Sequence, residues 1–485
     1  MTTPSPAPNI LNPDTQRSRT WRVGTLVYNR RTLVNVFIWM LWGDFCLYLM
    51  DAGVGNNLIL IQFKKYGASN TLIAIVKTSL VELIILVLCP IVSTWSDRHR
   101  SRLGRRIPFM LYVTPLLALF LMLVGLSPSI AQWIKSISPH FLAGIPVAGL
   151  TIGLLTVTYA AYKFCDIFPQ SVYYYLWADV IPPQVMGTFT CLFRVISTLG
   201  VLVFNKYLLK YCDDHPAAIC IGAASLYMVS FLLLCWQVKE GQYPPPPPAA
   251  TGPRGPRTLE YVKRFFRECF SHSFYWKYYL CLLCFNVGFA PFRDYLIFYG
   301  KDLKLDLGSY GNIMATQNLV QMAIYLCLGP IVDRLHPLRT GIFGYLLIFA
   351  AALCSFLFIH SSSSFGVWVV ITFAAIAIFQ GATTSLGPRL LPATHYGQFG
   401  AASAMVFHFG QMIFTPMLGV ITDHYGNWTI FPWLCAFSAV GVLLLYLVYR
   451  DWKTLGGDEA YVPPSTDTPP EQRGFDVVPI VEVRD

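Results

Sequence analysis

Long apolar runs alternate with short polar or basic links over most of the chain. A helix needs about 20 apolar residues to cross about 30 Å of hydrocarbon, and twelve runs are close to that length. They lie at about 33–58, 71–95, 107–126, 146–175, 187–209, 217–236, 276–299, 310–332, 340–360, 365–386, 399–421 and 429–449. This pattern predicts an all-α polytopic membrane protein with twelve transmembrane helices.

The basic residues of the links predict how the chain is oriented. Most of them fall on alternate links, which share one side of the membrane if every run crosses it. Links rich in Lys and Arg usually face the cytoplasm. We therefore expect a multi-pass protein of the plasma (inner) membrane with both termini in the cytoplasm. The residues concerned are Arg22, Arg30, Arg31, Arg98, Arg100, Arg102, Arg105, Arg106, Lys239, Arg254, Arg257, Lys263, Arg264, Arg267, Arg334, Arg339 and Arg389.

Two features divide the chain into halves. A long link with the proline run 244–248 separates the first six apolar runs from the last six. Residues 180–189 also resemble residues 390–399, and each segment precedes the fifth run of its half. Parallel repeats of this kind occur in transporters. We expect a cytoplasmic tail at 1–32, six-helix bundles at 33–238 and 276–450, a cytoplasmic linker at 239–275 and a cytoplasmic tail at 451–485.

Composition excludes several classes of protein. Of 485 residues, 55% are hydrophobic and 12% charged, whereas ordinary soluble domains carry about 25% charged residues. The net charge of +10 does not indicate nucleic-acid binding, because the basic residues cluster beside apolar runs. The sequence has no nucleotide-binding loop, metal-spaced His/Cys set or Ser/His/Asp arrangement. We expect no enzymatic activity, cofactor, resident metal or nucleic-acid partner, and only Cys212 and Cys220 as a plausible disulfide pair.

The link after the second run, residues 96–109, carries the strongest motif, SDRHRSRLGRRIPF. It resembles the signature loop of the major facilitator superfamily, in which Asp-Arg is followed closely by Gly-Arg-Arg. The insertion before Gly104 and the presence of Pro108 make the loop similar to that of the glycoside-pentoside-hexuronide:cation symporters and the related sucrose/proton symporters. The superfamily resemblance covers all twelve runs and implies a transporter built from two six-helix repeats.

The resemblance implies that this loop belongs to a cytoplasmic gate. Its carboxylate can meet a helix N-terminus, and its arginines can pair with acids or with helix C-termini. A second Asp-Arg pair at the equivalent place of the other half favours this interpretation over arginines that only set the topology. The gate candidates are Asp97, Arg98, Arg105, Arg106, Asp179, Asp333 and Arg334.

Charged and amide side chains are distributed unevenly among the runs. The third, sixth, ninth and twelfth runs have almost none in their interiors. In the fold that the chain resembles, every third helix is peripheral and the others line a central cavity. A charge at the bilayer centre costs about 2.5–3.5 kcal/mol even on insertion scales, so the other runs predict a polar cavity or internal pairs.

Helical spacing predicts how some of these side chains are arranged. Lys77 and Glu82 are five residues apart, so they point to different faces and need partners on other helices. Asp44 and Asp51 are seven residues apart and share a face, whereas Lys163 with Asp166 and His408 with Gln411 are three apart and can pair along theirs.

Carboxylates inside a span are candidates for binding a coupling ion, and here they are Glu82, Asp44, Asp166 and Asp51. The symporters that the chain resembles use protons or sodium, and their sodium users typically carry paired aspartates on the second helix. The second run here has Glu82 and Lys77 but no Asp. We therefore expect coupling to H+, with Na+ less favoured and uncoupled transport as an alternative.

Amides, cations and aromatic rings inside the spans are typical of a sugar site, because hydroxyls bind polar groups and the C–H face of a sugar packs on a ring. We therefore expect a monomeric, proton-coupled sugar or glycoside symporter in the lipid bilayer. Two arginines leave an organic anion as a second class of substrate. An efflux carrier or a membrane sensor of the same fold is also compatible with the pattern. The binding candidates are Trp42, Lys163, Arg194, Asn286, Arg293, Asn318, Gln321, Gln380, His408 and Gln411.

Overall fold

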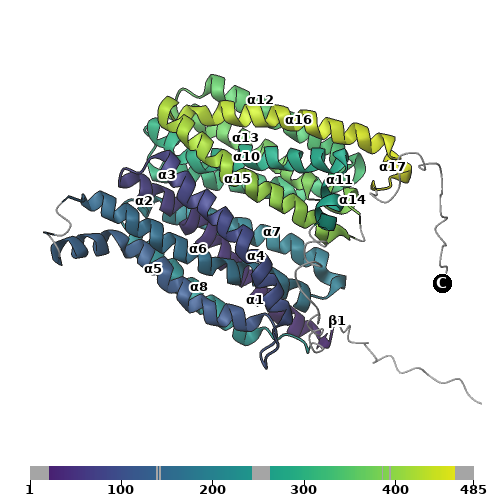
Figure 1. Ribbon diagram of the computed structural model, residues 1–485, viewed down its shortest axis with the longest axis horizontal. Coiled ribbons are helices and arrows are strands. Elements are labelled where there is room, and N and C mark those ends of the chain that lie inside the picture. Colours follow the sequence, from purple (N-terminus) through teal and green to yellow (C-terminus); the bar gives the residue numbers. More distant parts are fainter. Residues whose placement is uncertain are drawn as a thin grey trace, which may run out of the picture.

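The structure is a computed structural model that describes residues 21–137, 140, 144–242, 263–384, 386–392 and 395–464. The N-terminal half contains six long helical rods, drawn in purple to teal in Figure 1. They are α1 (Arg30–Tyr48) continued by η1 (Leu49–Leu58) and α2 (Ile59–Lys65), α3 (Asn70–Ala74) continued by η2 (Ile75–Ser79) and α4 (Leu80–Arg98), α5 (Ile107–Ile137), α6 (Val147–Val180), α7 (Met186–Val203) continued by η4 (Phe204–Leu208) and η5 (Leu209–Tyr211), and α8 (Pro216–Gln237).

The C-terminal half, drawn in green to yellow, repeats this arrangement beside the first half (Figure 1). Its long helices are α10 (Ser273–Asp302), α11 (Leu307–Leu335), α12 (Pro337–Phe358), α13 (Ser362–Thr383), α15 (Tyr396–Tyr425) and α16 (Ile430–Thr454). Short elements are η3 (Pro183–Val185), α14 (Leu386–Leu390), η7 (Asn427–Thr429) and α17 (Gly457–Ala460). Strands β1 (Trp21–Val23) and β2 (Leu26–Tyr28) form an antiparallel hairpin before α1, which the sequence did not predict.

Eleven helices in the described part of the chain are long and apolar enough to cross a membrane by length and composition. The twelfth long helix is α11, which carries Gln317, Asn318 and Gln321 near its middle. The predicted fold class, an all-α polytopic protein with two six-helix repeats, is confirmed. Several helices run past their predicted ends, as α5 does by continuing to Ile137, because hydropathy marks lipid contact and not the last helical turn.

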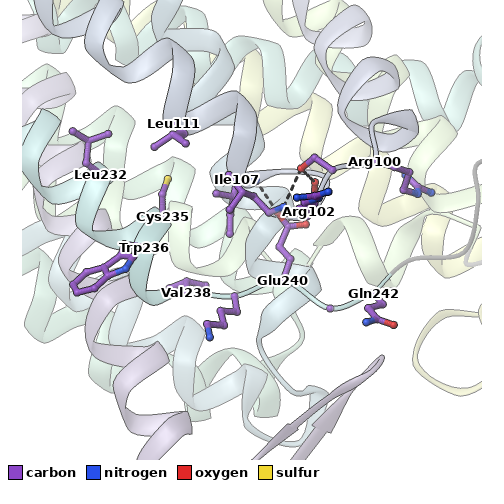
Figure 2. A pocket seen from close by; sticks show the side chains of 15 residues that line it. Arg100, Arg102, Ile107, Leu111, Leu232, Cys235, Trp236, Val238, Glu240 and Gln242 are labelled. Carbon is purple, nitrogen blue, oxygen red and sulfur yellow. Dashed lines mark hydrogen bonds between the residues drawn. The ribbon is translucent and has the colours of Figure 1, made fainter.

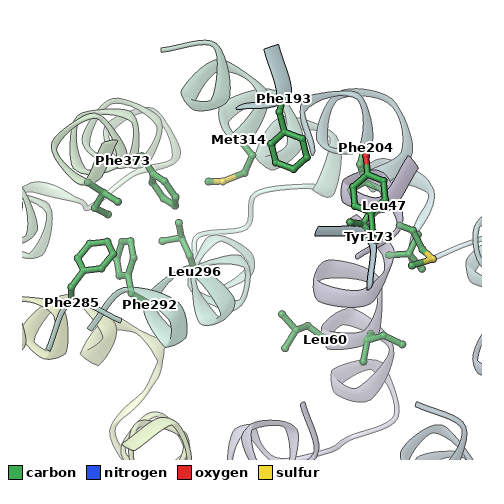
Figure 3. Packing of buried hydrophobic residues seen from close by; sticks show 14 of the residues in the cluster. Leu47, Leu60, Tyr173, Phe193, Phe204, Phe285, Phe292, Leu296, Met314 and Phe373 are labelled. Atoms are coloured by element: carbon green, nitrogen blue, oxygen red, sulfur yellow. The ribbon is translucent and has the colours of Figure 1, made fainter. Parts of the chain in front are cut away.

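Helices from the two halves meet along two seams. α15 packs against α3, η2 and α4, whereas α11 packs against α7 and η4. The helices α5, α8, α12 and α16 instead pack within their own halves. They correspond to the third, sixth, ninth and twelfth runs, so the predicted peripheral position of every third helix is confirmed. Buried apolar side chains fill the core of each half, such as Leu47 and Phe204 in the N-terminal half and Phe292 and Phe373 in the C-terminal half (Figure 3).

In the described part of the chain, three rods contain π-helical segments, η1, η2 and η4. The wider turn of a π-helix changes the direction in which the following side chains point, and such segments are frequent at functional sites. All three lie in rods that meet the other half or border the space between the halves. The sequence did not predict them.

The cysteine pair considered from the sequence is not bonded. Cys212 and Cys220 are both free and buried. Burial raises the pKa of the Cys212 thiol, and the nearby Cys220 adds to this shift. The Cys212 thiol is therefore not disposed to react as a thiolate.

Candidate functional site

A cavity of about 250 Å³ lies between the two halves. Its walls come from α1, η1, α7 and η4 on one side and from α10, α11 and α13 on the other. Five predicted binding residues lie in its lining, namely Arg194, Arg293, Asn318, Gln321 and Gln380. The other lining residues are Tyr48, Asn56, Asn57, Ser197, Thr198, Val201, Asn205, Phe289, Tyr310, Met314, Gln317, Tyr325 and Phe373.

Amide groups in this lining are available to a polar ligand. The oxygen Oε1 of Gln317 and the nitrogen Nδ2 of Asn318 are buried and have no hydrogen-bond partner among the described residues. Tyr325 instead donates a 2.7 Å hydrogen bond to Gln380 and accepts one from Gln321 at 2.9 Å. A buried polar atom without a partner costs about 1–3 kcal/mol, so a ligand that satisfies it gains affinity.

The charges in the described lining are all positive. Arg194 comes from the N-terminal half and Arg293 from the C-terminal half, and both are exposed to the space between the halves. The Arg194 side chain has no hydrogen bond or ion pair within the described residues, whereas that of Arg293 lies 3.3 Å from Asp294. No carboxylate belongs to the described lining. The described lining therefore carries a net positive charge.

Asp294 joins the halves through a buried ion pair. Its carboxylate accepts a hydrogen bond from Lys77 of η2, and it also meets Arg293. The predicted need of Lys77 for a partner on another helix is confirmed. Since each member of a buried pair is costly when its partner is removed, the pair favours the observed approach of the halves.

Lys163 is held by two carboxylates inside the N-terminal half. Its Nζ lies 2.5 Å from Asp51 and 3.0 Å from Asp166, which confirms the predicted pairing with Asp166. The Oδ1 atom of Asp166 is buried without a hydrogen-bond partner among the described residues. Alone this cluster has one more carboxylate than cations, but Lys77 and Arg293 of the neighbouring group around Asp294 also act on Asp51, and the two groups together hold three carboxylates and three cations.

The prediction that Asp44 and Asp51 share a face is wrong. Asp44 is fully buried and accepts a 2.6 Å hydrogen bond from Ser197 of α7, whereas Asp51 meets Lys163 of α6. The physical reason is the π-helical segment η1, which begins at Leu49 and breaks the α-helical phase between the two aspartates.

Glu82 forms a second contact between the halves. Its Oε2 lies 2.5 Å from Nδ1 of His408 on α15, so the predicted partner on another helix is confirmed. The expected pairing of His408 with Gln411 is wrong, because Gln411 accepts a hydrogen bond from Thr415 and is buried away from His408. Helical spacing within α15 did not predict that His408 contacts Glu82 on the facing helix.

Two further binding candidates lie outside the cavity lining. Trp42 donates a 3.0 Å hydrogen bond from Nε1 to Ser230 of α8 and stacks on Phe45. Asn286 donates to the carbonyl of Leu282 in its own helix. Trp42 and Asn286 thus lie outside the described lining of this cavity, as do Lys163, His408 and Gln411, and their role in binding a substrate stays a prediction.

A polar latch closes one end of the space between the halves. Asp423 of α15 accepts hydrogen bonds from the backbone N–H groups of Asn70 and Thr71 at 2.8 and 2.9 Å and from the Thr71 hydroxyl at 2.7 Å. It thereby caps the N-terminus of a helix in the other half. Asn70 is buried and also donates to Thr422 and Asn427. We call this end of the molecule the latch face.

Close backbone packing reinforces the latch. A Cβ atom on Gly419 would lie 2.9 Å from Cα of Thr71, and one on Gly311 would collide with the carbonyl oxygen of Asn205. Lys206 also donates a 2.8 Å hydrogen bond to Asn312 across the second seam. Glycine therefore permits both seams to close tightly at the latch face.

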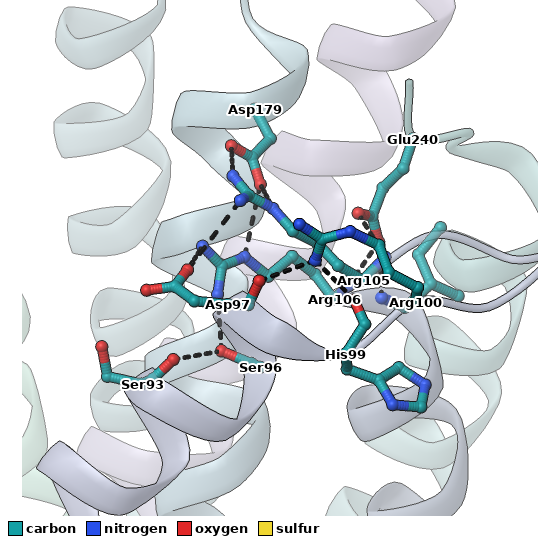
Figure 4. A network of polar contacts seen from close by, with 10 residues as sticks. Ser93, Ser96, Asp97, His99, Arg100, Arg105, Arg106, Asp179 and Glu240 are labelled. Carbon is teal, nitrogen blue, oxygen red and sulfur yellow. Dashed lines mark hydrogen bonds and ion pairs between the residues drawn. The ribbon is translucent and has the colours of Figure 1, made fainter. Parts of the chain in front are cut away.

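The opposite end, which carries residues 99–106, is called the arginine face. Arg105 makes a two-point contact with Asp179 at 2.6 and 3.0 Å. Arg106 reaches Asp97 at 2.5 Å and Asp179 at 3.3 Å (Figure 4). The predicted pairing of the loop arginines with Asp179 is confirmed. All of these residues belong to the N-terminal half.

Three gate candidates stand apart from this network. Arg98 is exposed and has no hydrogen bond or ion pair within the described residues. The side chains of Asp333 and Arg334 lie outside the described residues.

The polar contacts that join the two halves are confined to one part of the molecule. Between described residues, every such hydrogen bond or ion pair lies either at the level of Glu82 and His408 or nearer to the latch face.

Glu240 organises the start of α5, which the sequence did not predict. It follows α8, and its carboxylate accepts the backbone N–H groups of Arg105, Arg106 and Ile107 at 2.9, 2.7 and 2.7 Å (Figure 4). Gly104 has φ +109° and lies so close that a Cβ atom would be 2.5 Å from Cδ of Glu240. Glycine is required here because it adopts a positive φ without strain and because a side chain would collide with the Glu240 carboxylate.

Comparisons with known proteins support the same fold. A family model described as Major Facilitator Superfamily matches residues 216–415. The chain is similar to a bacterial homologue of the human lysosomal transporter Spinster in an inward-facing, unoccupied conformation, with 12% identity, 87% of this chain and 97% of that chain covered and a TM-score of 0.58. It is also similar to an inward-facing bacterial homologue of the iron transporter ferroportin, with 13% identity, 87% and 99% coverage and a TM-score of 0.58.

A third similar structure is a bacterial metal transporter, with 12% identity, 89% and 100% coverage and a TM-score of 0.53. No curated protein matches the chain. The arrangement of helices defines a polytopic membrane protein with a central cavity between two repeats. Its fold is that of the major facilitator superfamily, and the family-model match supports that superfamily. None of these matches singles out the symporter branch.

Proposed function

We propose that this protein is a secondary active transporter that works by alternating access. The observation that carries the proposal is the asymmetry of the contacts around the central cavity. The Asp423 latch joins the halves at one face, whereas the described polar contacts at the arginine face each stay within one half. Two rigid halves that separate at one face while they close at the other expose the cavity to each side in turn.

The arginine face is the cytoplasmic face in this proposal. The positive-inside rule supports this orientation, because Arg100, Arg102, Arg105 and Arg106 all lie in one link. The conformation described here then opens towards the cytoplasm, with both termini on that side and the protein in the plasma membrane. A single chain contains both halves, so a monomer suffices for the cycle.

The pair formed by Glu82 and His408 supports coupling to protons. The two side chains lie 2.5 Å apart on facing helices, so a proton between them holds α4 and α15 together. Loss of that proton leaves a carboxylate facing a neutral imidazole and weakens the contact between the halves. Asp166, with its unpartnered oxygen, is the second candidate for the coupling proton.

The cavity supports a small hydroxylated solute such as a sugar or glycoside. Gln317, Asn318 and Gln321 present amide groups, and Phe289 and Phe373 present ring faces in the same lining. Hydroxyls can satisfy the amides while the C–H surface of the solute packs on a ring.

An organic anion is the second candidate, because Arg194 lines the cavity and makes no hydrogen bond or ion pair among the described residues, and Arg293 shares Asp294 with Lys77. A charge-assisted hydrogen bond to a guanidinium group is typically worth about 1.5–3 kcal/mol, enough to favour an acidic solute over its neutral parent. The described residues contain no group of three or more His, Cys, Asp or Glu that could hold a metal ion.

A ligand screen followed by counterflow tests the proposal. Purified protein is screened by thermal shift against neutral sugars, sugar acids and other organic anions, since a true ligand raises the melting temperature by mass action. Each hit is then tested for exchange across proteoliposomes preloaded with the same solute. Exchange in protein-containing vesicles but not in empty ones is expected. A ligand that stabilises the protein and never exchanges would identify a sensor instead of a transporter.

The Arg194→Gln variant decides between the two substrate classes. A sugar acid should lose about tenfold to a hundredfold in affinity when the guanidinium is replaced, whereas its neutral parent sugar should lose little. Trp42→Phe is a suitable control, because Trp42 lies outside the cavity lining. Equal losses for both ligands would point to a general effect on the cavity.

A further inference from the structure

A second and larger cavity, of about 1120 Å³, lies at the arginine face of the N-terminal half. It sits in the groove between the first turns of α5 and the last turns of α8 (Figure 2). Ile107 and Leu111 form one wall, and Leu232 and Trp236 form the other. Since α5 and α8 are peripheral helices, this groove is separate from the seams between the halves and from the central cavity.

The rim of the cavity on its polar side carries unpaired positive charge. Arg102 and Lys239 are exposed and make no hydrogen bond or ion pair within the described residues. The one carboxylate in the described lining belongs to Glu240, and its oxygens already accept three backbone N–H groups at the start of α5. The field at the rim is therefore positive, because the charge of Glu240 is directed at a helix N-terminus.

The walls of the cavity lie where the bilayer meets water. α8 ends at Gln237 and α5 begins at Ile107, so the apolar walls end where the basic residues begin. Trp236 has 73% of its surface exposed, and exposed Trp residues near a helix end are typical of the membrane interface. A molecule in this cavity would thus have an apolar part beside the two helices and a polar part beside Arg102 and Lys239.

We propose that this cavity binds an anionic phospholipid from the leaflet at the arginine face. The phosphate lies between Arg102 and Lys239, and the upper acyl chains run along Leu111, Leu232 and Trp236. Charge complementarity identifies the head group, and the apolar walls identify the lipid. A soluble phosphate compound would leave those walls uncovered, and a zwitterionic lipid would leave the two cations unbalanced.

The Arg102→Gln/Lys239→Gln double variant tests the head-group contacts. Purified full-length protein is titrated with phosphatidylglycerol whose acyl chains carry bromine, and quenching of Trp fluorescence is measured. Trp236→Phe identifies the part of the signal that comes from this cavity. Each basic residue near an anionic lipid contributes about fivefold in affinity, so the double variant should bind about 25-fold more weakly in the Trp236-dependent signal. The matched control is Arg450→Gln/Lys453→Gln, which removes two exposed cations from the end of α16.

Three further measurements can overturn the proposal. Brominated phosphatidylcholine with the same chains should give at most a tenth of the Trp236-dependent affinity, and equal affinity would refute charge recognition. Glycerol phosphate should not compete, and full competition would mean that the cavity binds a soluble phosphate. Leu111→Trp fills the apolar wall and should reduce lipid binding in a protein that still elutes as the folded species. Absence of Trp236-dependent quenching in the wild type would mean that another part of this chain covers the groove.

Discussion

The latch makes a quantitative prediction for the Asp423→Asn variant. The carboxylate receives three hydrogen bonds from Asn70 and Thr71, at 2.7–2.9 Å, and it caps the helix that begins at Asn70. An asparagine keeps one oxygen but turns an NH₂ group towards at least one of these donors. The substitution therefore removes one or two charge-assisted bonds together with the favourable interaction between a negative charge and a helix N-terminus.

The size of the effect follows from these contacts. A hydrogen bond to a charged group contributes about 1.5–3 kcal/mol, and the lower end applies because Asp423 is exposed on one side. A loss of about 1.5–2 kcal/mol raises the population in which the latch is open by about 10-fold to 30-fold. The backbone N–H groups of Asn70 and Thr71 should become less protected by the same factor.

Hydrogen exchange followed by mass spectrometry measures this change directly. A peptide that covers residues 66–76 should exchange about 10-fold to 30-fold faster in Asp423→Asn, whereas a peptide that covers residues 103–110 should be unchanged or better protected. His424→Gln is a matched control, because its side chain contacts only a carbonyl of its own helix. Unchanged exchange at residues 66–76 would refute the account of the latch.

The other predictions concern coupling, the loop and topology. Glu82→Gln imitates a permanently protonated side chain, so proteoliposomes should lose accumulation driven by a pH gradient but retain solute exchange; accumulation that persists would transfer the role to Asp44 or Asp166. Glu240→Gln should speed amide exchange at residues 105–107 by about tenfold, because a charged acceptor of three N–H groups is lost, and leave residues 66–76 unchanged; the control is Glu268→Gln, whose carboxylate contacts only side chains. An impermeant thiol reagent on intact cells should modify Ser361→Cys and spare Gln242→Cys, and the reverse pattern would invert the topology.

The sequence was sufficient to predict the helices, the peripheral layer and part of the cavity. Hydropathy locates a span because lipid contact constrains every residue around the helix. The pairing of Lys163 with Asp166 was predictable because both lie on one helix at a fixed spacing. The contacts of Arg105 and Arg106 with Asp179 were accessible through the family resemblance of the loop.

Contacts between helices were not predictable in the same way. The sequence indicated that Lys77 and Glu82 need partners, but the choice of Asp294 and His408 depends on the rotation and the relative height of facing helices. The π-helical segment η1 changes the angle between the side-chain directions of Asp44 and Asp51, and no residue pattern in the sequence predicted this segment. Glu240 and Asp423 were missed for a related reason, since an isolated acid beside a span gives no sign of the helix end that it caps.

Reciprocal movement of the two faces is the most direct test of alternating access. Spin labels at Leu103 and Tyr396 report on the arginine face, and labels at Tyr211 and Ser363 report on the latch face, because all four positions are exposed and each pair spans the two halves. Distances are measured by double electron–electron resonance in a protein freed of reactive cysteines. The account predicts that Asp423→Asn lengthens the latch-face distance and shortens the arginine-face distance in the same fraction of molecules. Lengthening at the latch face with an unchanged arginine face would contradict it.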